Sequence, residues 1–367
     1  MNNNSQWLTS FRSQNLGLTM AGLVCFALLF ACSGSAKPQN SAVDSEAKGG
    51  IEDSSRNRTP GIILNDFSKQ ISQVVRIVYQ DQQGRIWFGT ENGAFVVVGD
   101  SLTHIDGIQS EIGKGVSIKS IAEGKDGRIW FGHTDGLSVM EGDSVTNYYE
   151  SDGLLNNDVW CIEVDASGTV WVGTYEGLCR FDGQVFTPFS LPEGQIDTNL
   201  AISSTKMVHR ILEDSSGGLW FCTNAGLFSY KNNRLKHVSK LLGIQTNFIT
   251  DIVEAKKGEY WLSSPSGLIH LKEEQLMHDT KAVLSHYKGI GGIQVDSMGD
   301  LWFNCHRAIF RYNGHQVITH LEEKGENGPL TFKIYRDHLN RLWFVGFGGA
   351  YRYENGELLN ITKKGPF

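Results

Sequence analysis

One tryptophan recurs seven times along this 367-residue chain, and its regular spacing restricts the possible folds more than any other feature. The intervals are 43, 41, 49, 41, 41 and 41 residues, between Trp87, Trp130, Trp171, Trp220, Trp261, Trp302 and Trp343. A fixed period of this length is typical of an architecture built from repeated units. Because a single repeat-built β domain can reach this size, we expect one domain rather than two or three.

Each unit carries the pattern of four short strands. A β-branched residue stands nine positions before every tryptophan, from Val78 in the first unit to Ile334 in the last, as a buried strand prefers. A turn with Gly or Asn then leads to the tryptophan strand, and Gly or Ala six residues after the tryptophan marks a hairpin. A further turn and an apolar residue begin the fourth strand. This pattern predicts an all-β fold, a seven-bladed β-propeller with four-stranded antiparallel blades, over residues 61–367. A solenoid is the alternative, but the units contain no helix signal.

Two recurring side chains have structural explanations. The tryptophans are expected to pack between neighbouring blades, because each buries a large apolar area. An aspartate six residues before the tryptophan is expected to accept hydrogen bonds from the turn rather than to bind calcium, whose loops need further oxygen ligands. It occurs in five units, at Asp81, Asp165, Asp214, Asp296 and Asp337. How the last blade closes stays open, since both 61–67 and 358–361 have strand character.

The first 60 residues differ in kind from the repeats. Residues 1–31 contain one base, Arg12, no acid, and an apolar run over 21–31 that is too short to span a bilayer, which predicts a signal peptide. The following Leu29-Phe30-Ala31-Cys32 resembles the bacterial lipobox, so we expect lipidation of Cys32, although Phe30 is larger than the usual residue. An ordinary cleaved signal is the alternative. Residues 32–60 then form the lipidated cysteine and a flexible, disordered tether with a span of about 30 Å.

The cysteines after the tether favour neither a metal site nor a disulfide framework. They have irregular spacing and no C-x-x-C pair, so we expect buried free thiols at Cys161, Cys179, Cys222 and Cys305. No metal and no cofactor is predicted. The net charge of −7 without a basic stripe makes nucleic acid a poor partner, because phosphates are bound mainly by Lys and Arg.

The repeat segments GRIWFGTENGA, GRIWFGHTDGL and GTVWVGTYEGL resemble two-component regulator propeller repeats. The last two units depart from that motif at Asn304, Asn340 and Val345. In that family such propellers form periplasmic sensing parts of hybrid histidine kinases. The resemblance implies an exported ligand-binding or sensing module on the periplasmic side of the envelope. Ser33 after the lipidated cysteine implies, again by resemblance, anchoring to the outer membrane of a Gram-negative cell.

The expected binding face carries the loops from fourth to first strands and the hairpins after the tryptophan strands. Loops on a rigid scaffold are where binding residues concentrate. Aromatic rings mixed with donors and acceptors suit a small polar ligand, a carbohydrate or a peptide, although solvated hairpin residues with no ligand are an open alternative. The candidate ligand-binding residues are His133, Asp135, Trp160, Tyr175, Glu176, His209, Arg210, Asn224, His306 and Arg307.

Three functions remain open from the sequence. The first is a membrane-anchored binding or sensing module, and the second is a protein–protein scaffold within an envelope complex. The third is an enzyme resembling propeller lyases such as virginiamycin B lyase, with His133, His209 and His306 converging from different blades. No His-x-His or His-Glu pairing supports a metal-dependent enzyme, so a non-enzymatic role is favoured. The sequence does not identify the ligand, the partner or the pathway.

Overall fold

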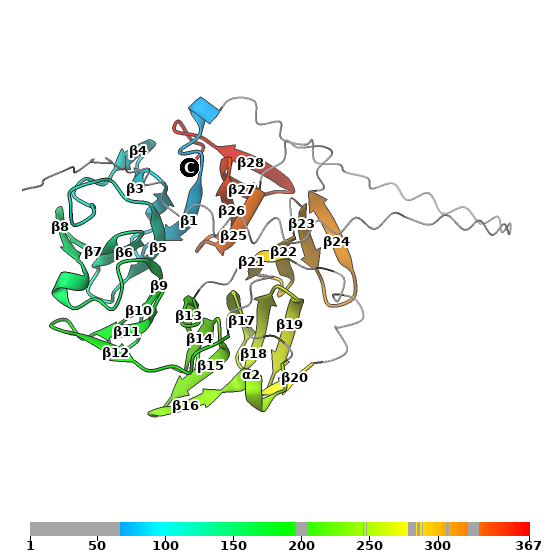
Figure 1. The fold of residues 1–367 in the computed structure, drawn as a ribbon. Helices are drawn as coiled ribbons and strands as arrows, with labels where there is room; N and C mark the ends of the chain where they lie inside the picture. Colours follow the sequence, from blue (N-terminus) through cyan, green and yellow to red (C-terminus); the bar gives the residue numbers. More distant parts are fainter. Residues whose placement is uncertain are drawn as a thin grey trace, which may run out of the picture.

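The computed structural model describes residues 67–195, 204–244, 246, 248–277, 284, 287, 289–305, 308–321 and 330–367. These residues form seven four-stranded antiparallel sheets, each with its strands in sequence order, arranged around a common axis (Figure 1). The sheets are the blades of a seven-bladed β-propeller, numbered here 1 to 7 along the chain. The predicted fold is therefore confirmed.

The strands have these bounds in blades 1 to 4: β1 (Val75–Gln80), β2 (Ile86–Thr90), β3 (Gly93–Val98), β4 (Ser101–His104); β5 (Ile118–Glu123), β6 (Ile129–His133), β7 (Gly136–Glu141), β8 (Ser144–Tyr148); β9 (Val159–Val164), β10 (Val170–Thr174), β11 (Gly177–Phe181), β12 (Phe186–Phe189); β13 (Val208–Glu213), β14 (Leu219–Thr223), β15 (Gly226–Lys231), β16 (Arg234–His237). Blades 5 to 7 contain β17 (Asp251–Lys256), β18 (Glu259–Ser264), β19 (Gly267–Lys272), β20 (Gln275–Leu276); β21 (Ile290–Val295), β22 (Leu301–Cys305), β23 (Ala308–Tyr312), β24 (Val317–Leu321); β25 (Leu330–Arg336), β26 (Leu342–Phe347), β27 (Gly349–Glu354), β28 (Glu357–Ile361).

Short helical turns lie outside the blades: η1 (Phe67–Lys69), η2 (Glu150–Asp152) and α2 (Val238–Leu241). Across the described residues, no helix is both long and apolar enough to cross a membrane. The predicted signal peptide, Cys32 and the tether lie outside the described residues.

The repeated tryptophans form the junctions between blades, as predicted. Each indole lies in a buried second strand and contacts an aromatic ring of the following blade, which excludes water from the junction. The ring centroids are 4.6–6.0 Å apart in the pairs Trp87–Phe131, Trp130–Phe181, Trp171–Phe221, Trp220–Tyr260, Trp261–Tyr312, Trp302–Phe344 and Trp343–Phe88. The last pair joins blade 7 to blade 1, so the ring is closed.

The turn aspartates are structural, and each has a second role that the sequence did not reveal. In blade 1 one carboxylate oxygen of Asp81 accepts from the backbone of Gln83 and Arg85, as expected. The other oxygen accepts from Nε1 of Trp87 at 2.8 Å. The same indole-to-carboxylate bond, at 2.8–2.9 Å, occurs in the four other units that have the aspartate. The aspartate therefore fixes the turn and the tryptophan together.

The last blade is completed by the C-terminal strand. Of the two strand candidates, β28 is the outer strand of blade 7, paired to β27, whereas residues 61–66 lie outside the described residues. The junction to blade 1 also contains an isolated bridge between Gln70 and Thr362. In the same junction the Gln80 side chain accepts from the backbone nitrogen of His338 at 2.7 Å. All four described cysteines are buried free thiols, as expected.

Candidate functional site

The first strands of the blades surround the axis of the ring (Figure 1), and most of them have an irregular pairing at the same position. In blades 1 to 4, and at Phe332 in blade 7, the pairing with the second strand skips one residue, two positions before the buried β-branched residue. Such a bulge leaves its extra residue unpaired and turns its side chain in a new direction. We call the four bulged residues of blades 1 to 4 the axial row, and they are Arg76, Lys119, Trp160 and His209. All four are half-buried.

Trp160 and Lys119 form one unit within the axial row. The Lys119 ammonium lies 4.0 Å from the centroid of the Trp160 ring and also forms an ion pair with Asp158. The indole nitrogen of Trp160 donates to the same Asp158 carboxylate at 3.0 Å. An aromatic ring held between a cation and an anion is fixed in orientation, so its remaining surface is rigid.

His209 is held by neighbours on the face that carries the hairpins and the long loops. Its Nε2 lies 2.6 Å from Oδ1 of Asn224, and its ring packs edge-on against Phe248 at 4.6 Å. Asn224 is buried and donates to the carbonyl of Ser204. Burial lowers the pKa of His209 to about 4, although the Asn224 bond opposes this, so the ring is neutral at pH 7. The structure thus brings two of the candidate residues, His209 and Asn224, into contact.

His133 takes the place of a hairpin threonine. In other blades a hydroxyl at this position, such as Thr90, donates to the carbonyl of the hairpin glycine and accepts from a backbone nitrogen. His133 is fully buried, its Nε2 lies 2.9 Å from Oγ of Ser138, and its Nδ1 accepts from the backbone of Asp135. Burial and the charge of Lys119 lower its pKa to about 3. The structure places His133 inside a hairpin, and we do not retain it as a ligand contact.

The remaining predicted residues fall into three groups. Asp135 and Glu176 are exposed at the hairpin tips of blades 2 and 3, and Tyr175, next to Glu176, is half-buried. Arg210 follows His209 and belongs to the charged cluster described next. His306 and Arg307 lie outside the described residues.

A charged cluster spans three blades near the axis. Nε of Arg210 on β13 lies 3.6 Å from Oδ1 of Asp251 on β17, and Nζ of Lys333 on β25 lies 3.7 Å from Oδ2. Asp251 is 8% exposed, whereas the two cations retain 29% and 25% of their side-chain surface. Burial is nevertheless the largest influence on Lys333 and lowers its pKa. These side chains have lost much of their hydration but keep some contact with solvent. They therefore lie in a narrow space, here the interior of the ring.

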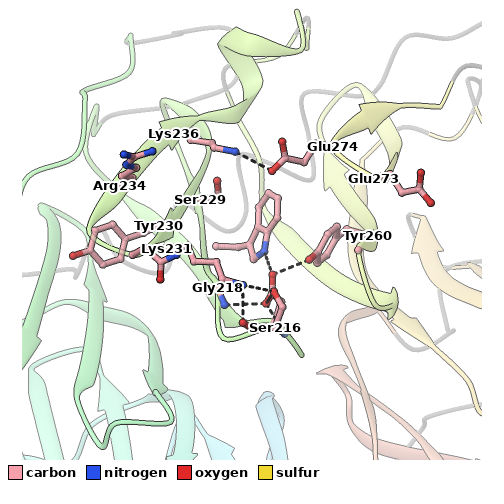
Figure 2. Close-up of a pocket in the computed structure, with 14 residues that line it drawn as sticks. Ser216, Gly218, Ser229, Tyr230, Lys231, Arg234, Lys236, Tyr260, Glu273 and Glu274 are labelled. Carbon is pink, nitrogen blue, oxygen red and sulfur yellow. Dashed lines mark hydrogen bonds and ion pairs between the residues drawn. The ribbon is translucent and has the colours of Figure 1, made fainter.

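A groove between blades 4 and 5 is a second candidate site, which the sequence analysis missed (Figure 2). It lies on the face opposite the axial row, with a volume of about 630 Å³, and its floor is formed by Trp220 and Tyr260. Both of these side chains donate to Asp214 at 2.8 Å. Lys236 of blade 4 and Glu274 of blade 5 form an ion pair across it, as Figure 2 shows. Its charged rim is completed by Lys231, Arg234 and Glu273.

The groove exists because the residue that covers Trp220 from the third strand is small. Trp220 pairs with Ser229, whereas the equivalent partner of Trp261 is His270, stacked at 4.0 Å, and that of Trp130 is Val139. Trp220 is 8% exposed, more than any other tryptophan of the repeat. Serine at this one position was the available sequence signal for the groove.

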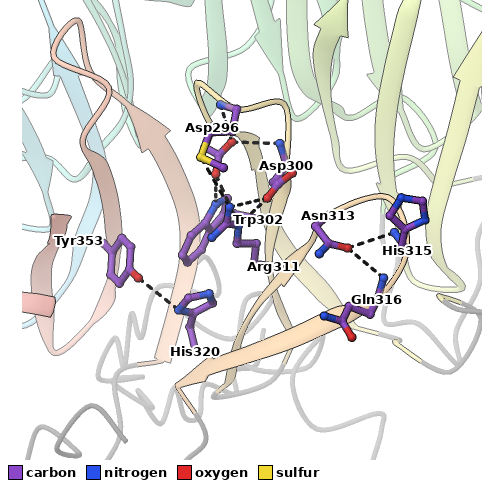
Figure 3. A network of polar contacts seen from close by, with 10 residues as sticks. Asp296, Asp300, Trp302, Arg311, Asn313, His315, Gln316, His320 and Tyr353 are labelled. Carbon is purple, nitrogen blue, oxygen red and sulfur yellow. Dashed lines mark hydrogen bonds and ion pairs between the residues drawn. The ribbon is translucent and has the colours of Figure 1, made fainter. Parts of the chain in front are cut away.

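A polar network on blade 6 has a packing role rather than a chemical one (Figure 3). Trp302 donates to Asp296, and Arg311 donates to Asp300 at 2.6 Å. The His320 ring lies 4.4 Å from Trp302 and forms a weak contact with the Tyr353 hydroxyl of blade 7. Burial and the nearby Arg311 charge lower the pKa of His320. The network fills the junction between blades 6 and 7.

The described residues contain no group of three or more His, Cys, Asp or Glu side chains arranged to hold a metal ion. Of the three histidines considered for a lyase, His133 is enclosed in its hairpin, His209 is tied to Asn224, and His306 lies outside the described residues.

Comparisons with known proteins agree with this architecture. The model of the two component regulator propeller family matches residues 69–92, 113–135 and 153–176. No curated protein matches the sequence. Among solved structures, the extracellular domain of a putative hybrid two component system from B. thetaiotaomicron is 17% identical with a TM-score of 0.61. That match covers 80% of this chain, which spans only 39% of that domain.

Two further structures share the fold at lower identity. A streptogramin B lyase is 14% identical, with a TM-score of 0.58 over 77% of this chain and 95% of its own. YCF48 bound to D1 peptide is 10% identical, with a TM-score of 0.56 over 81% of this chain and 95% of its own. Such identities show the fold alone, and propellers of this shape host unrelated functions. This chain is therefore a seven-bladed propeller whose first three blades match the two component regulator propeller family.

Proposed function

We propose that this chain is an exported ligand-binding or sensing module and that its ligand binds on the axial face, by which we mean the face that carries the hairpins after the tryptophan strands, together with the axial row. The observation that carries the proposal is the axial row. Blade 7 and blades 1 to 4, which adjoin one another in the closed ring, share the same bulge, and the unpaired side chains of blades 1 to 4 differ: two cations, an indole and an imidazole. Bulges that re-aim side chains occur preferentially beside functional sites. Packing alone does not require different chemistry at one repeated position.

A small polar ligand fits this face best. Trp160 offers a rigid aromatic surface, and Asn224 and His209 form a polar pair in the neighbouring blade. A few directed polar groups beside aromatic surface are typical of sites for small molecules, carbohydrates or peptide ends. The lyase alternative is not proposed, because two of the histidines considered for it, His133 and His209, are engaged in hydrogen bonds with neighbouring side chains.

Binding is tested by thermal shift of the full chain with a panel of oligosaccharides, peptides and metabolites. A ligand that binds only the folded state raises the melting temperature. Each compound that raises it is titrated against Trp160→Ala, for which we expect at least tenfold weaker binding. The matched control is Leu339→Ala, an exposed apolar residue in a turn on the opposite face, which should bind as the wild type does. No active compound, or equal binding by both variants, would contradict the proposal.

We further propose that the module is lipid-anchored through Cys32, on the periplasmic side of the envelope and in the outer membrane of a Gram-negative cell. The lipobox resemblance supports this. Cells expressing the chain are labelled with a clickable fatty acid and then separated into inner and outer membranes. Wild-type protein should carry the label in the outer-membrane fraction, and Cys32→Ser should not. Labelling that persists in Cys32→Ser, or wild-type protein in the cytosol, would exclude the anchor.

A protein–protein scaffold is the second candidate, and the groove between blades 4 and 5 favours it. The groove combines an aromatic floor with a charged rim, and Leu241 at its apolar end is 70% exposed. Exposed apolar surface rimmed by charge is common at interaction sites. Co-purification from detergent-solubilised envelopes tests this role. A partner that is lost with Leu241→Asp but retained with Ile112→Asp, an exposed control on blade 2's entry loop, would support the scaffold.

A further inference from the structure

The cluster of Arg210, Asp251 and Lys333 is an unbalanced group of charges near the axis. Two cations share one carboxylate, and neither separation, 3.6 and 3.7 Å, is short enough for a good hydrogen bond. Nε of Arg210 is buried and has no hydrogen-bond partner among the described residues. Buried donors are normally satisfied, and an exception requires an explanation. An Arg held beside a carboxylate without bonding it retains donors for another acceptor.

The nearest further carboxyl group does not restore the balance at neutral pH. Glu163 on β9 is close enough to Arg210 for their charges to interact. Burial raises its pKa to about 7, although Arg210 opposes this, so much of the population is protonated and neutral. The cluster is therefore net positive in a chain whose overall charge is −7.

Blade 6 leaves room for these side chains. Lys333 of blade 7 reaches Asp251 of blade 5 past β21, where the sequence has Gly291 and Gly292. A Cβ on Gly292 would lie 2.9 Å from Cα of Lys333 and 2.8 Å from the backbone nitrogen of Ile334. A residue with a side chain would push β25 away and separate the cation from its partner. The paired glycines thus allow β25 to lie close enough for Lys333 to reach Asp251.

We propose that the Arg210–Asp251–Lys333 cluster binds an oxyanion group, a carboxylate, sulfate or phosphate, of the ligand that enters from the axial face. The planar guanidinium donates to two oxygens of such a group, and the ammonium acts as a second point of positive charge. Asp251 holds both cations in position. This inference rests on the proposed ligand-binding function and specifies the chemistry of its ligand.

The test is isothermal titration of the full chain with inorganic phosphate, sulfate and citrate at constant ionic strength set with chloride. We expect saturable binding of at least one of them. Arg210→Gln and Lys333→Gln should each weaken it at least tenfold. Arg210→Lys, which keeps the charge but loses the planar fork, should have an intermediate affinity. The matched control is Arg234→Gln, an exposed arginine at the distant groove, which should bind as the wild type does.

The pH dependence of anion affinity is a second test. It is measured on the wild-type protein, so it does not depend on whether the Arg210 and Lys333 variants fold. The charged or titratable groups around Glu163 are Cys161 of β9, Arg210 and Glu213 of β13, Asp165 in the following turn and Tyr79 of β1. As Glu163 ionises, it competes with the ligand for Arg210. Affinity for sulfate, whose own charge is constant, should therefore fall between pH 6 and pH 8, and Glu163→Gln should remove this fall.

Two outcomes would overturn the inference. One is the absence of saturable binding of all three anions by the wild type, and the other is undiminished binding by folded Arg210→Gln and Lys333→Gln. If neutral compounds bind in a Trp160-dependent manner while no anion does, the oxyanion inference fails and the binding function stands. If neither class binds, both fail.

Discussion

Trp343 of the last repeat packs edge-on against Phe88 of the first, with ring centroids 5.8 Å apart at an interplanar angle of 64°. These residues are 255 positions apart in the sequence, yet their contact repeats the geometry of the junctions between consecutive blades. The first and last repeats therefore meet through the contact that joins all the others, and the closed ring is what fixes the axial face.

The closing pair is expected to be energetically coupled. Phe88→Ala and Trp343→Ala should each lower the free energy of unfolding by about 3–5 kcal/mol, since both side chains are fully buried. Their double mutant should lose less than the sum, by about 0.5–1.5 kcal/mol, because the ring–ring contact is lost only once. Urea unfolding of the four proteins measures this. Additive losses would mean that the first and last repeats do not touch.

The hydrogen bond that a turn aspartate accepts from its indole should contribute more to stability than the charge of the aspartate does. Asp214→Ala leaves the Trp220 nitrogen and the Tyr260 hydroxyl without their shared acceptor. Each unsatisfied buried donor costs about 1–3 kcal/mol, so the melting temperature should fall clearly. Asp126→Ala is the control, because the corresponding turn of blade 2 has Gly124 at the indole-binding position and Asp126 bonds only Arg128. The control should change stability by no more than about 0.5 kcal/mol, and equal effects would disprove the assigned role.

Stability should fall with acidity because two histidines are held neutral. The folded pKa values of His133 and His209, about 3 and about 4, lie below the ordinary value of 6.5. Below pH 6.5 the unfolded chain binds protons that the fold excludes, so the free energy of unfolding falls as the pH drops toward 4. Each histidine contributes a slope of at most about 1.4 kcal/mol per pH unit.

Restoring the threonine of the repeat, His133→Thr, should reduce that slope. The exposed His315→Thr is the matched control and should leave it unchanged. Urea midpoints measured from pH 7 to pH 4.5 give the slopes. A wild-type slope that His133→Thr does not alter would show that His133 is protonated freely in the fold.

Glycine 292 is expected to be intolerant of even one methyl group. Gly292→Ala places a Cβ under 3 Å from the backbone of β25 and should destabilise the junction of blades 6 and 7, lowering the melting temperature by several degrees. Gly115→Ala meets no atom within 4 Å and should be neutral or slightly stabilising. Calorimetry of the two variants decides between them. Tolerance at both positions would show that β21 and β25 are farther apart than described.

The sequence was sufficient to predict the fold because every level of the pattern agreed. The tryptophan period gave the blade number, and the turn glycines and β-branched residues placed the strands. Closure could not be predicted, since both chain ends have strand-like apolar residues and only tertiary pairing decides between them.

The candidate site was less predictable, for physical reasons. Histidine is a common ligand-binding residue type, but His133 takes the place of a hairpin threonine and bonds within its own hairpin. The sequence alone does not show these hydrogen bonds. Arg76 and Lys119 were missed because a bulge shifts them relative to the alternation of the strand. The charge imbalance around Asp251 depends on residues 41 and 82 positions away, brought together only by the ring.

Hydrogen–deuterium exchange of the full chain, with and without the tightest-binding compound of the panel, tests the central claim most directly. The account predicts slower exchange in the segments that carry the axial face, 75–80, 118–123, 159–164 and 208–213, with the groove segments 229–236 and 258–274 unchanged. Protection confined to the groove, or no protection in any first strand, would contradict the claim that the axial face binds the ligand.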